Sequence, residues 1–326
     1  MSRYLVTGGA GYVGGVVTAH LLAAGHEVTV LDDLSTGFRE GVPAGAEFVE
    51  GSIRDAGKWL DPSYAGVLHF AASSQVGESV VNPEKYWRNN VGGTTELLTA
   101  MREAGVRTLV FSSTAAVYGE PETSPITEDA RTAPTSPYGA TKLAVDHMIT
   151  GECAAHGLAA VSLRYFNVAG AHGEQGERHD PESHLIPLVL QAALGRREAI
   201  HVFGEDYPTP DGTCVRDYIH VDDLAEAHLL ALDAATGGEH LICNLGNGNG
   251  FSVREVIETA RQVTGRPIPE VAAERRGGDP AVLVASAERA RTRLGWNPTR
   301  ADLAGIIADA WEFARREQQR KDASIS

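Results

Sequence analysis

The sequence predicts an α/β protein in which a doubly wound parallel sheet is joined to a smaller α/β lobe. In the first half of the chain, short apolar runs alternate with helical patterns, as expected for buried parallel strands covered by helices. Beyond residue 167 the alternation loosens, and loops rich in Gly, Pro, Glu and Asp interrupt shorter helices at 169–183, 204–216 and 274–281. No flexible linker separates the two halves. We therefore expect two closely packed lobes with a ligand cleft beyond the carboxyl ends of the strands.

The alternation in the first half places each expected element in turn. Six apolar runs are expected to form the strands: 4–7, 27–31, 47–49, 67–70, 108–111 and 160–163. A helix is expected at 13–24, where Gly25 ends it. Another is expected at 83–104, with Asn82 as the N-cap and Pro83 as the first helical residue.

The same patterns set the expected boundaries of the lobes. The larger lobe is expected to span residues 1–167 and to regain 216–245. The smaller lobe is expected to hold 168–215 and 246–315. The last residues, 316–326, are expected to be a disordered tail.

Charge and cysteine content exclude several classes of function. The chain has 28 lysine and arginine residues against 43 aspartate and glutamate residues, a formal net charge of −15. Such a chain has no general attraction to nucleic acid or to an anionic membrane, so we expect neither as a partner. Its three cysteines, Cys153, Cys214 and Cys243, are widely spaced and odd in number, which suits a reducing compartment. The N-terminus enters an apolar strand without a signal peptide, and we expect a cytoplasmic protein.

A glycine triplet, Gly8, Gly11 and Gly14, lies directly between the first expected strand and the first expected helix. This spacing is typical of a Rossmann sheet, where it allows a tight turn, a close backbone approach to a pyrophosphate and close packing of helix on strand. The helix N-terminus then faces the phosphates with unpaired N–H groups. Asp32 ends the second expected strand, where its carboxylate can accept both ribose hydroxyls and repel a 2′-phosphate. The combination predicts NAD rather than NADP.

Tyr138 and Lys142 are four residues apart in a helical pattern, so their side chains are expected on one helix face. A tyrosine with a pKa near 10 must lose about 3 units to act as a base at neutral pH, which is roughly 4 kcal/mol. One cation at about 4 Å and an effective dielectric constant near 20 supplies roughly that energy. The pair therefore predicts a base and its electrostatic partner, and an oxidised nicotinamide would add a second positive charge.

The run Ser112-Ser113-Thr114 lies at the carboxyl end of an expected strand and hence at the cleft. Thr114 is placed to bond a substrate hydroxyl and to share its proton with Tyr138, whereas Ser112 is read as an ordinary turn-forming residue. The histidines form no metal-type spacing. His220 and its neighbours Asp217 and Asp222 are expected to be a strand end and a helix cap, and no metal site is predicted.

Several longer runs carry a resemblance to a known family. They are 69–71 (HFA), 76–79 (VGES), 89–91 (NNV), 163–167 (LRYFN), 202–209 (VFGEDYPT) and 211–221 (DGTCVRDYIHV). With the motifs above, they resemble the extended short-chain dehydrogenase/reductase superfamily and, within it, the UDP-glucose 4-epimerases. The resemblance covers residues 3–313.

The resemblance implies a reaction and a role for each member of the motifs. Tyr138 would remove the proton of the sugar C4 hydroxyl while hydride passes to the nicotinamide, with Lys142 as its electrostatic partner and Thr114 as the proton-sharing hydroxyl. The 4-keto sugar would then turn over and take hydride back on its other face, so that UDP-galactose and UDP-glucose interconvert. NAD would therefore be a prosthetic group. A homodimer formed through the helices at 83–104 and 138–155 is also implied.

The resemblance also implies two sets of binding residues. The expected cofactor contacts are Gly8, Gly11, Tyr12, Val13, Gly14, Asp32, Asp33, Ser52, Ile53, Phe70, Ala71, Ala72, Asn90, Ser112, Ser113, Tyr138, Lys142 and Tyr165. The expected UDP-sugar contacts are Thr114, Tyr138, Asn167, His184, Leu185, His201, Phe203, Arg216, Arg276, Asp279 and Leu283.

Departures from the family pattern and rival functions define what must be tested. Ser52 replaces an aspartate that usually binds the adenine, and Leu283 is intermediate between a tyrosine that excludes an N-acetyl group and a small residue that admits one. A 4-epimerase of another UDP-sugar, such as UDP-N-acetylglucosamine or UDP-glucuronate, is therefore an alternative. A nucleotide-sugar 4,6-dehydratase would need an acidic pair where Ala115 and Ala116 stand. A non-catalytic NAD-sensing regulator would not need Tyr138 and Lys142.

Overall fold

Seven parallel strands form the larger sheet of the computed structural model, which describes residues 1–277 and 279–325. They are β1 (Arg3–Thr7), β2 (Glu27–Asp32), β3 (Glu47–Glu50), β4 (Tyr64–His69), β5 (Thr108–Thr114), β6 (Ala159–Tyr165) and β10 (His240–Leu245). Their spatial order is β10-β6-β5-β4-β1-β2-β3, and every neighbouring pair is parallel. The order reverses between β1 and β4, and a doubly wound sheet opens its ligand crevice at such a point.

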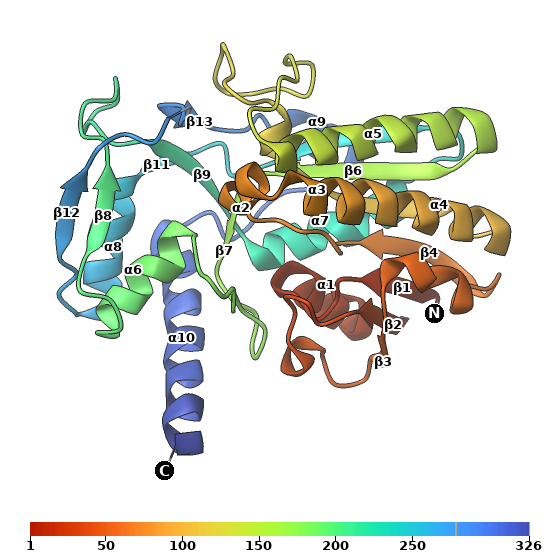
Figure 1. The fold of residues 1–326 in the computed structure, drawn as a ribbon, viewed down its shortest axis with the longest axis horizontal. Coiled ribbons are helices and arrows are strands. Elements are labelled where there is room, and N and C mark those ends of the chain that lie inside the picture. Colours follow the sequence, from red (N-terminus) through yellow and green to blue (C-terminus); the bar gives the residue numbers. More distant parts are fainter. Residues whose placement is uncertain (278, 326) are drawn as a thin grey trace.

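Helices cover both faces of this sheet, each over its own apolar core (Figure 1). On one face, α1 (Tyr12–Ala23), α7 (Val221–Ala234) and α9 (Glu288–Leu294) bury residues such as Leu21, Leu224 and Trp296. On the other face, α4 (Gly93–Ala104) and α5 (Pro137–His156) bury Leu97, Met101, Val145 and Ile149. Burial on both faces explains why the strands read as continuous apolar runs.

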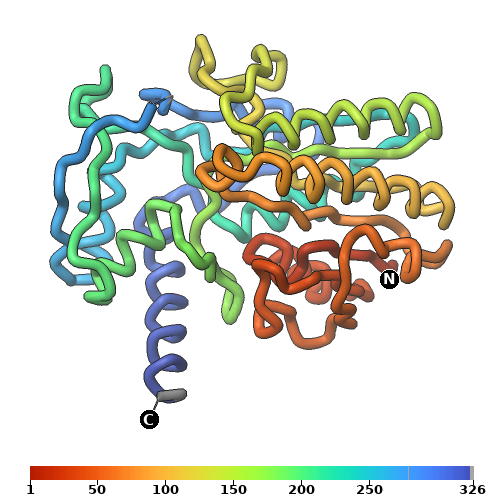
Figure 2. Tube along the Cα trace, viewed as in Figure 1, coloured from red at the N-terminus to blue at the C-terminus, as the bar shows by residue number. Residues whose placement is uncertain are grey.

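The smaller lobe is built around β9 (Val215–His220), which pairs with three other strands. Its partners are β7 (Asn167–Ala169), β11 (Gly250–Ser252) and β13 (Val282–Leu283). A separate parallel pair joins β8 (Ile200–Phe203) to β12 (Glu270–Ala273). A third apolar core lies among the helices α6 (Leu185–Ala193), α8 (Val253–Thr264) and α10 (Leu303–Ile325). Figure 2 follows the chain from the red N-terminal end of the larger lobe into the smaller lobe, and the cyan segment of α7 and β10 returns to the larger sheet.

Short helical segments complete the structure. They are η1 (Arg39–Gly41), η2 (Ile53–Lys58), α2 (Val76–Val81), α3 (Pro83–Tyr86), η3 (Trp87–Gly92) and η4 (Ala115–Val117). The helix expected at 83–104 is present, and its middle residues form a π-helical segment, η3, between α3 and α4. Asn82 occupies the N-cap position of α3, but its side chain makes no capping hydrogen bond. In the part of the chain that the structure describes, no helix is both long and apolar enough to cross a bilayer.

The six expected strands are present: β1, β2 and β3 each extend one residue beyond the expected bounds, and the other three differ by more. β4 begins at Tyr64 rather than at residue 67, while β5 and β6 extend to Thr114 and Tyr165. The apolar core of each strand is visible in the sequence, but polar residues at the strand ends continue the hydrogen-bonded ladder toward the cleft. The extensions matter because they carry Thr114 and Tyr165.

The lobe boundaries differ from the expectation at three places. Within 216–245, α7 and β10 return to the larger sheet, but β9 belongs to the smaller sheet. α9 was expected in the smaller lobe and instead packs with the core of the larger one, where Trp296 donates to the Asp223 carbonyl at 2.8 Å. Residues 316–325 continue α10 instead of forming a disordered tail, because Glu317 pairs with Arg178 at 3.0 Å. Residue 326 lies outside the described residues.

Candidate active site

A cavity of about 550 Å³ opens beyond the carboxyl ends of the larger sheet. Both lobes contribute to its wall. The larger lobe supplies the glycine loop at 8–14 and the ends of β2, β5 and β6, while the smaller lobe supplies Asn167, Arg216, Asp279 and Leu283. This is the position in which doubly wound sheets bind their ligands.

The glycine loop forms a cradle that side chains would fill. Gly8 has a φ of +76°, and a Cβ there would lie 2.5 Å from the Ala71 nitrogen. A Cβ on Gly14 would lie 2.3 Å from the Gly8 carbonyl oxygen. Gly11 is the N-cap of α1 and has no side chain with which to cap it, so the first N–H groups of the helix are available to an anion. The loop therefore fits the pyrophosphate of a dinucleotide.

Asp32 ends β2 beside this cradle and is only 8% exposed. Its Oδ2 accepts from the Ala10 N–H at 3.0 Å and its Oδ1 accepts from the Leu34 N–H at 2.9 Å. Burial raises the pKa of Asp32 and these two hydrogen bonds lower it, with a net upward shift. The backbone thus fixes the carboxylate in the cavity wall, where it remains an acceptor for a ribose. The neighbouring wall residues Ser35, Thr36 and Gly37 were missed from the sequence because they follow no fixed motif.

Most of the expected cofactor contacts lie in the cavity wall. These are Gly8, Gly11, Tyr12, Val13, Gly14, Asp32, Asp33, Ile53, Phe70, Ala71, Ala72, Ser112, Tyr138, Lys142 and Tyr165. Ser52 does not lie there, and its Oγ accepts from the Arg54 N–H at 3.3 Å as the N-cap of η2. Asn90 stands behind the wall and holds Ser73, accepting from its N–H at 2.8 Å and donating to its carbonyl at 3.0 Å. Ser113 also faces away and donates to Asp146 at 3.3 Å.

Tyr138 and Lys142 lie on the first turns of α5, which the Ser136 hydroxyl caps by accepting from the Gly139 N–H at 3.2 Å. Burial raises the pKa of Tyr138 to about 12, although the Thr114 hydroxyl bonded to it lowers the value. Burial lowers the pKa of Lys142 to about 7, and Asp146 opposes that shift. The Lys142 Nζ donates to the Ser112 carbonyl at 2.7 Å rather than to the phenol. The two residues thus lie one turn apart on α5, as the spacing predicted, with the Thr114 hydroxyl bonded to the phenol and the ammonium bonded to the Ser112 carbonyl.

Ser112 has a larger part in this wall than expected. Its carbonyl accepts from Lys142, and its hydroxyl bonds the Tyr165 hydroxyl. Burial raises the pKa of Tyr165, and the Ser112 hydroxyl opposes the shift. Two tyrosines and a lysine thus meet at the ends of β5 and β6, a place suited to moving a proton.

The expected substrate residues divide into two groups. Those in the cavity wall are Thr114, Tyr138, Asn167, His184, Arg216, Asp279 and Leu283. Arg216 forms an ion pair with Asp279, and β13 places Leu283 beside Arg216 in register. The others lie outside the wall: Leu185, His201, Phe203 and Arg276. The Arg276 guanidinium lies 4.0 Å from the centre of the Phe203 ring, and the His201 ring stacks with that of Phe203 at 6.2 Å between centroids.

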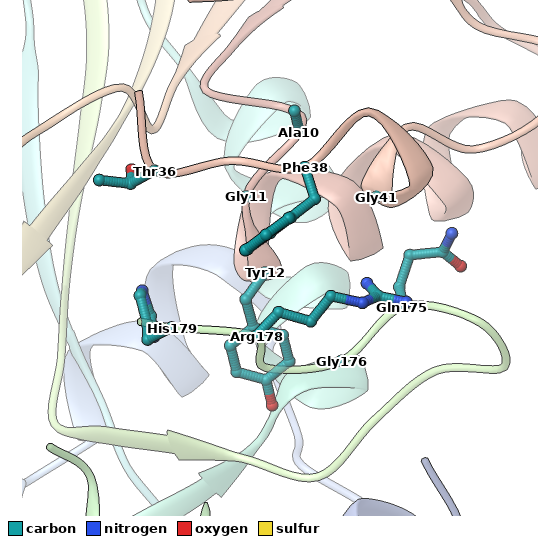
Figure 3. Close-up of a pocket in the computed structure, with 10 residues that line it drawn as sticks. All are labelled: Ala10, Gly11, Tyr12, Thr36, Phe38, Gly41, Gln175, Gly176, Arg178 and His179. Carbon is teal, nitrogen blue, oxygen red and sulfur yellow. The ribbon is translucent and has the colours of Figure 1, made fainter. Parts of the chain in front are cut away.

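The segment before α6 adds wall residues that the sequence reading did not single out, Glu177 and His179. Burial opposes the charge of His184, but hydrogen bonds with Glu177 and Glu182 outweigh it and raise the pKa of His184. A crevice of about 40 Å³ separates this segment from the glycine loop. Figure 3 shows Tyr12 and Phe38 facing the part of the segment that carries Arg178 and His179.

Residues 4–246 of the chain match the NAD dependent epimerase/dehydratase family, which is three quarters of its length. The chain belongs to this family. A UDP-glucose 4-epimerase of Streptomyces lividans is 72% identical over 316 residues, covering 95% of each chain. A UDP-glucose 4-epimerase of Brucella ovis, solved in complex with NAD, matches with a TM-score of 0.92 at 45% identity over 96% of this chain and 98% of that one. A UDP-Glc/GlcNAc 4-epimerase of Campylobacter jejuni matches with a TM-score of 0.85 at 39% identity, over 97% of this chain and 100% of that one.

Membership of the epimerase/dehydratase family leaves two chemistries to distinguish, and the residues after β5 separate them. Dehydration at C5 and C6 needs an acid and a base in addition to Tyr138. The wall positions directly after Thr114 are Ala115 and Ala116, whose methyl groups transfer no proton. The site therefore has the groups for oxidation and reduction at one carbon and lacks an acidic pair at these positions.

Proposed function

We infer that the chain is an NAD-dependent UDP-glucose 4-epimerase, which interconverts UDP-galactose and UDP-glucose. The observation that carries this inference is that Thr114, Tyr138 and Lys142 line the same cavity as the glycine loop and Arg216. Such a lining can hold a dinucleotide and a nucleotide sugar side by side, with proton-carrying groups available to both. The names of the similar proteins agree with this assignment.

In the proposed mechanism, bound NAD supplies a hydride acceptor and donor at the sugar C4. Tyr138 takes the proton of the C4 hydroxyl and later returns it, and Thr114 bonds the same oxygen and orients it. Lys142 is buried at the Ser112 carbonyl, and its charge favours the phenolate form of Tyr138. In the ligand-free protein burial keeps the phenol neutral. The positive charge of a bound oxidised nicotinamide would favour its ionisation.

The proposed UDP end of the cavity is built by Arg216, Asp279 and Leu283. Arg216 offers forked donors to a pyrophosphate, which a chain of net charge −15 would otherwise repel. Asp279 orients the guanidinium through its ion pair. Leu283 packs against the buried cluster of Val117, Tyr118 and Ile126 and is proposed to face the sugar C2.

We propose that the protein is a cytoplasmic homodimer formed through the faces of 83–104 and 138–155, as the family resemblance implies. α5 in this region also carries Tyr138 and Lys142, so a dimer would brace the helix that bears the proposed base. Sedimentation velocity on the purified chain tests this assembly, and a single species at the monomer mass would exclude it.

The activity is tested by incubating the purified protein with UDP-galactose and no added cofactor, and resolving the products by anion-exchange chromatography. Formation of UDP-glucose, together with NAD released on denaturation, is the expected result. The Tyr138→Phe variant is the control, because it retains the cavity and loses the ionisable oxygen. A 4-keto-6-deoxy product would instead indicate a dehydratase.

A further inference from the structure

Four side chains with metal-binding atoms meet on the segment just before α6. They are Glu177, His179, Glu182 and His184, and their ligand atoms all lie within 4.8 Å of one another. Glu177 Oε1 is 2.9 Å from His179 Nδ1 and 2.7 Å from His184 Nδ1, and Glu182 Oε1 is 2.9 Å from the same His184 atom. We propose that this cluster binds one divalent cation of the zinc class.

The spacing of the four atoms suits a tetrahedral site. Zinc bonds to histidine nitrogen and carboxylate oxygen at about 2.0–2.1 Å, which places the four ligands about 3.3 Å apart. The distances in the cluster, from 2.7 Å to at most 4.8 Å, bracket that value. All four residues lie within 177–184, so closing around an ion requires side-chain shifts within one segment and no movement of the lobes.

The charge of the cluster also favours a cation. The Glu177 and Glu182 side chains are only 9% and 6% exposed. Within residues 1–277 and 279–325, no lysine or arginine forms an ion pair with either carboxylate. Arg178 lies between them and turns away, bonding Glu317 at 3.0 Å with its guanidinium over the Phe313 ring. In the free protein the His184 imidazole pairs with both carboxylates. A metal ion would displace protons from the imidazoles as it binds, and the two carboxylates would then supply the charge of −2 that balances a divalent cation.

The ligand types select the metal. Two imidazole nitrogens with two carboxylate oxygens suit zinc, cobalt or nickel, whereas magnesium and calcium prefer oxygen ligands alone. A second group, His20, His172 and Asp222, offers only three ligand atoms. Arg300 lies 3.3 Å from Asp222 and already supplies a positive charge there. The cluster before α6 is therefore the stronger of the two sites.

A bound ion would stabilise a segment that lines two cavities. Glu177 and His179 line the proposed active-site cavity and also a groove of about 680 Å³ against α6 and α10. His179 additionally borders the crevice by the glycine loop (Figure 3). The ion would cross-link this wall, and its binding is measured without substrate, so the result of the titration does not depend on the proposed function.

The test is a zinc titration of the untagged holoenzyme after treatment with EDTA, in competition with a chromophoric chelator. We expect one equivalent per chain, with zinc affinity at least tenfold weaker in His179→Asn and in Glu182→Gln. The matched control is His172→Asn, which removes an imidazole from the other cluster and should leave the affinity unchanged. A hundredfold excess of magnesium should not compete, and cobalt should give the visible absorption of a tetrahedral site.

Three outcomes would overturn the proposal. If the wild-type protein does not bind one equivalent of zinc, the proposal is wrong. This outcome requires no variant, so it does not depend on whether a substituted protein folds. Loss of binding in His172→Asn with retention in His179→Asn would assign the ion to the other cluster. Equal affinity for magnesium and zinc would show that the imidazoles are not ligands.

Discussion

The side chains of Tyr138 and Lys142 are buried one turn apart on α5. Burial disfavours the charged form of each side chain. Tyr138→Phe keeps the ring and removes the proton-carrying oxygen. We expect kcat for UDP-galactose to fall by a factor of about 10²–10⁴, with little change in substrate affinity. The matched control is Tyr64→Phe, whose hydroxyl donates to Thr29 in the core away from the cavity. A near-normal kcat in Tyr138→Phe would remove this residue from the mechanism.

Asp32 combines two properties, an acceptor oxygen and a negative charge, and two variants separate them. Asp32→Ala should weaken NAD binding about tenfold or more, because a hydrogen bond with a charged group is worth about 1.5–3 kcal/mol. Asp32→Asn keeps one acceptor oxygen, so it should retain more NAD affinity while losing the repulsion of a 2′-phosphate. Calorimetric titration with NAD and NADP measures both effects. Equal affinity of the wild type for the two cofactors would contradict this assignment.

Leu283 is proposed to limit the space beside the sugar C2. Its intermediate size predicts UDP-glucose and UDP-galactose as the main pair, with slower turnover of UDP-N-acetylglucosamine. Leu283→Tyr should abolish the slower activity by filling the space and change the main activity by only a few-fold. Leu283→Met keeps the volume and is the control. Competition assays with both sugars give the ratio, and an unchanged ratio in Leu283→Tyr would mean that another residue limits the space.

For single residues, the sequence predicted some positions in the site and misplaced others. Gly8, Asp32 and Tyr138 line the cavity, and each was singled out by short-range spacing within its own part of the chain. Ser52 was placed at the cofactor from a motif position, yet its hydroxyl caps η2. Arg276 and Phe203 were both assigned to the substrate, and in the structure they contact each other. Side-chain direction in loops depends on tertiary contacts that sequence spacing does not encode.

At the scale of elements, a buried ion pair ties α5 to the sheet. Asp146 lies one turn beyond Lys142 and bonds Arg164 of β6 at 2.8 Å, with both side chains almost fully buried. Asp146→Asn leaves the Arg164 charge unbalanced and should lower the free energy of unfolding by about 3 kcal/mol. It also removes the carboxylate that raises the pKa of Lys142. Urea unfolding measures the stability loss.

The control for that prediction is an exposed pair of the same kind. Lys58 and Asp55 lie 2.7 Å apart on the surface, and Asp55→Asn should cost no more than about 1 kcal/mol. If Asp146→Asn were equally mild, the Asp146–Arg164 pair would not anchor α5.

Helices and strands that depend on nearby residues could be predicted from the sequence, whereas those that depend on distant residues could not. The strands and helices of the larger sheet follow hydrophobic periodicity, which a sequence displays directly. The π-helical turn η3 was not foreseen, because it reflects packing of the 87–92 segment against α5 and α4. β9 looked like part of the larger lobe because it directly precedes α7, but its hydrogen bonds go to β7, β11 and β13. Strand partners separated by long stretches of chain are decided by the whole fold.

The stability of the whole molecule should depend on pH through Lys142. Its pKa is about 7 in the folded, ligand-free protein and near 10.5 in the unfolded chain. Between these values the unfolded chain binds more protons, so stability rises with pH, by at most about 1.4 kcal/mol per unit. Lys142→Met should lack this rise and be more stable than the wild type near pH 7. Denaturant unfolding of both NAD-free proteins from pH 7 to 10 measures the difference, and parallel pH profiles would contradict the buried-ammonium description.

The pairing of β10 with β6 has a consequence for biosynthesis. A ribosome releases β1 to β6 in order, but residues 166–239 must follow before β10 emerges. During that interval β6, with its apolar sequence Ala-Ala-Val-Ser-Leu, is an uncovered edge whose N–H and carbonyl groups lack a neighbouring strand. Translational pausing in this interval would therefore prolong the period in which nascent chains can aggregate through β6.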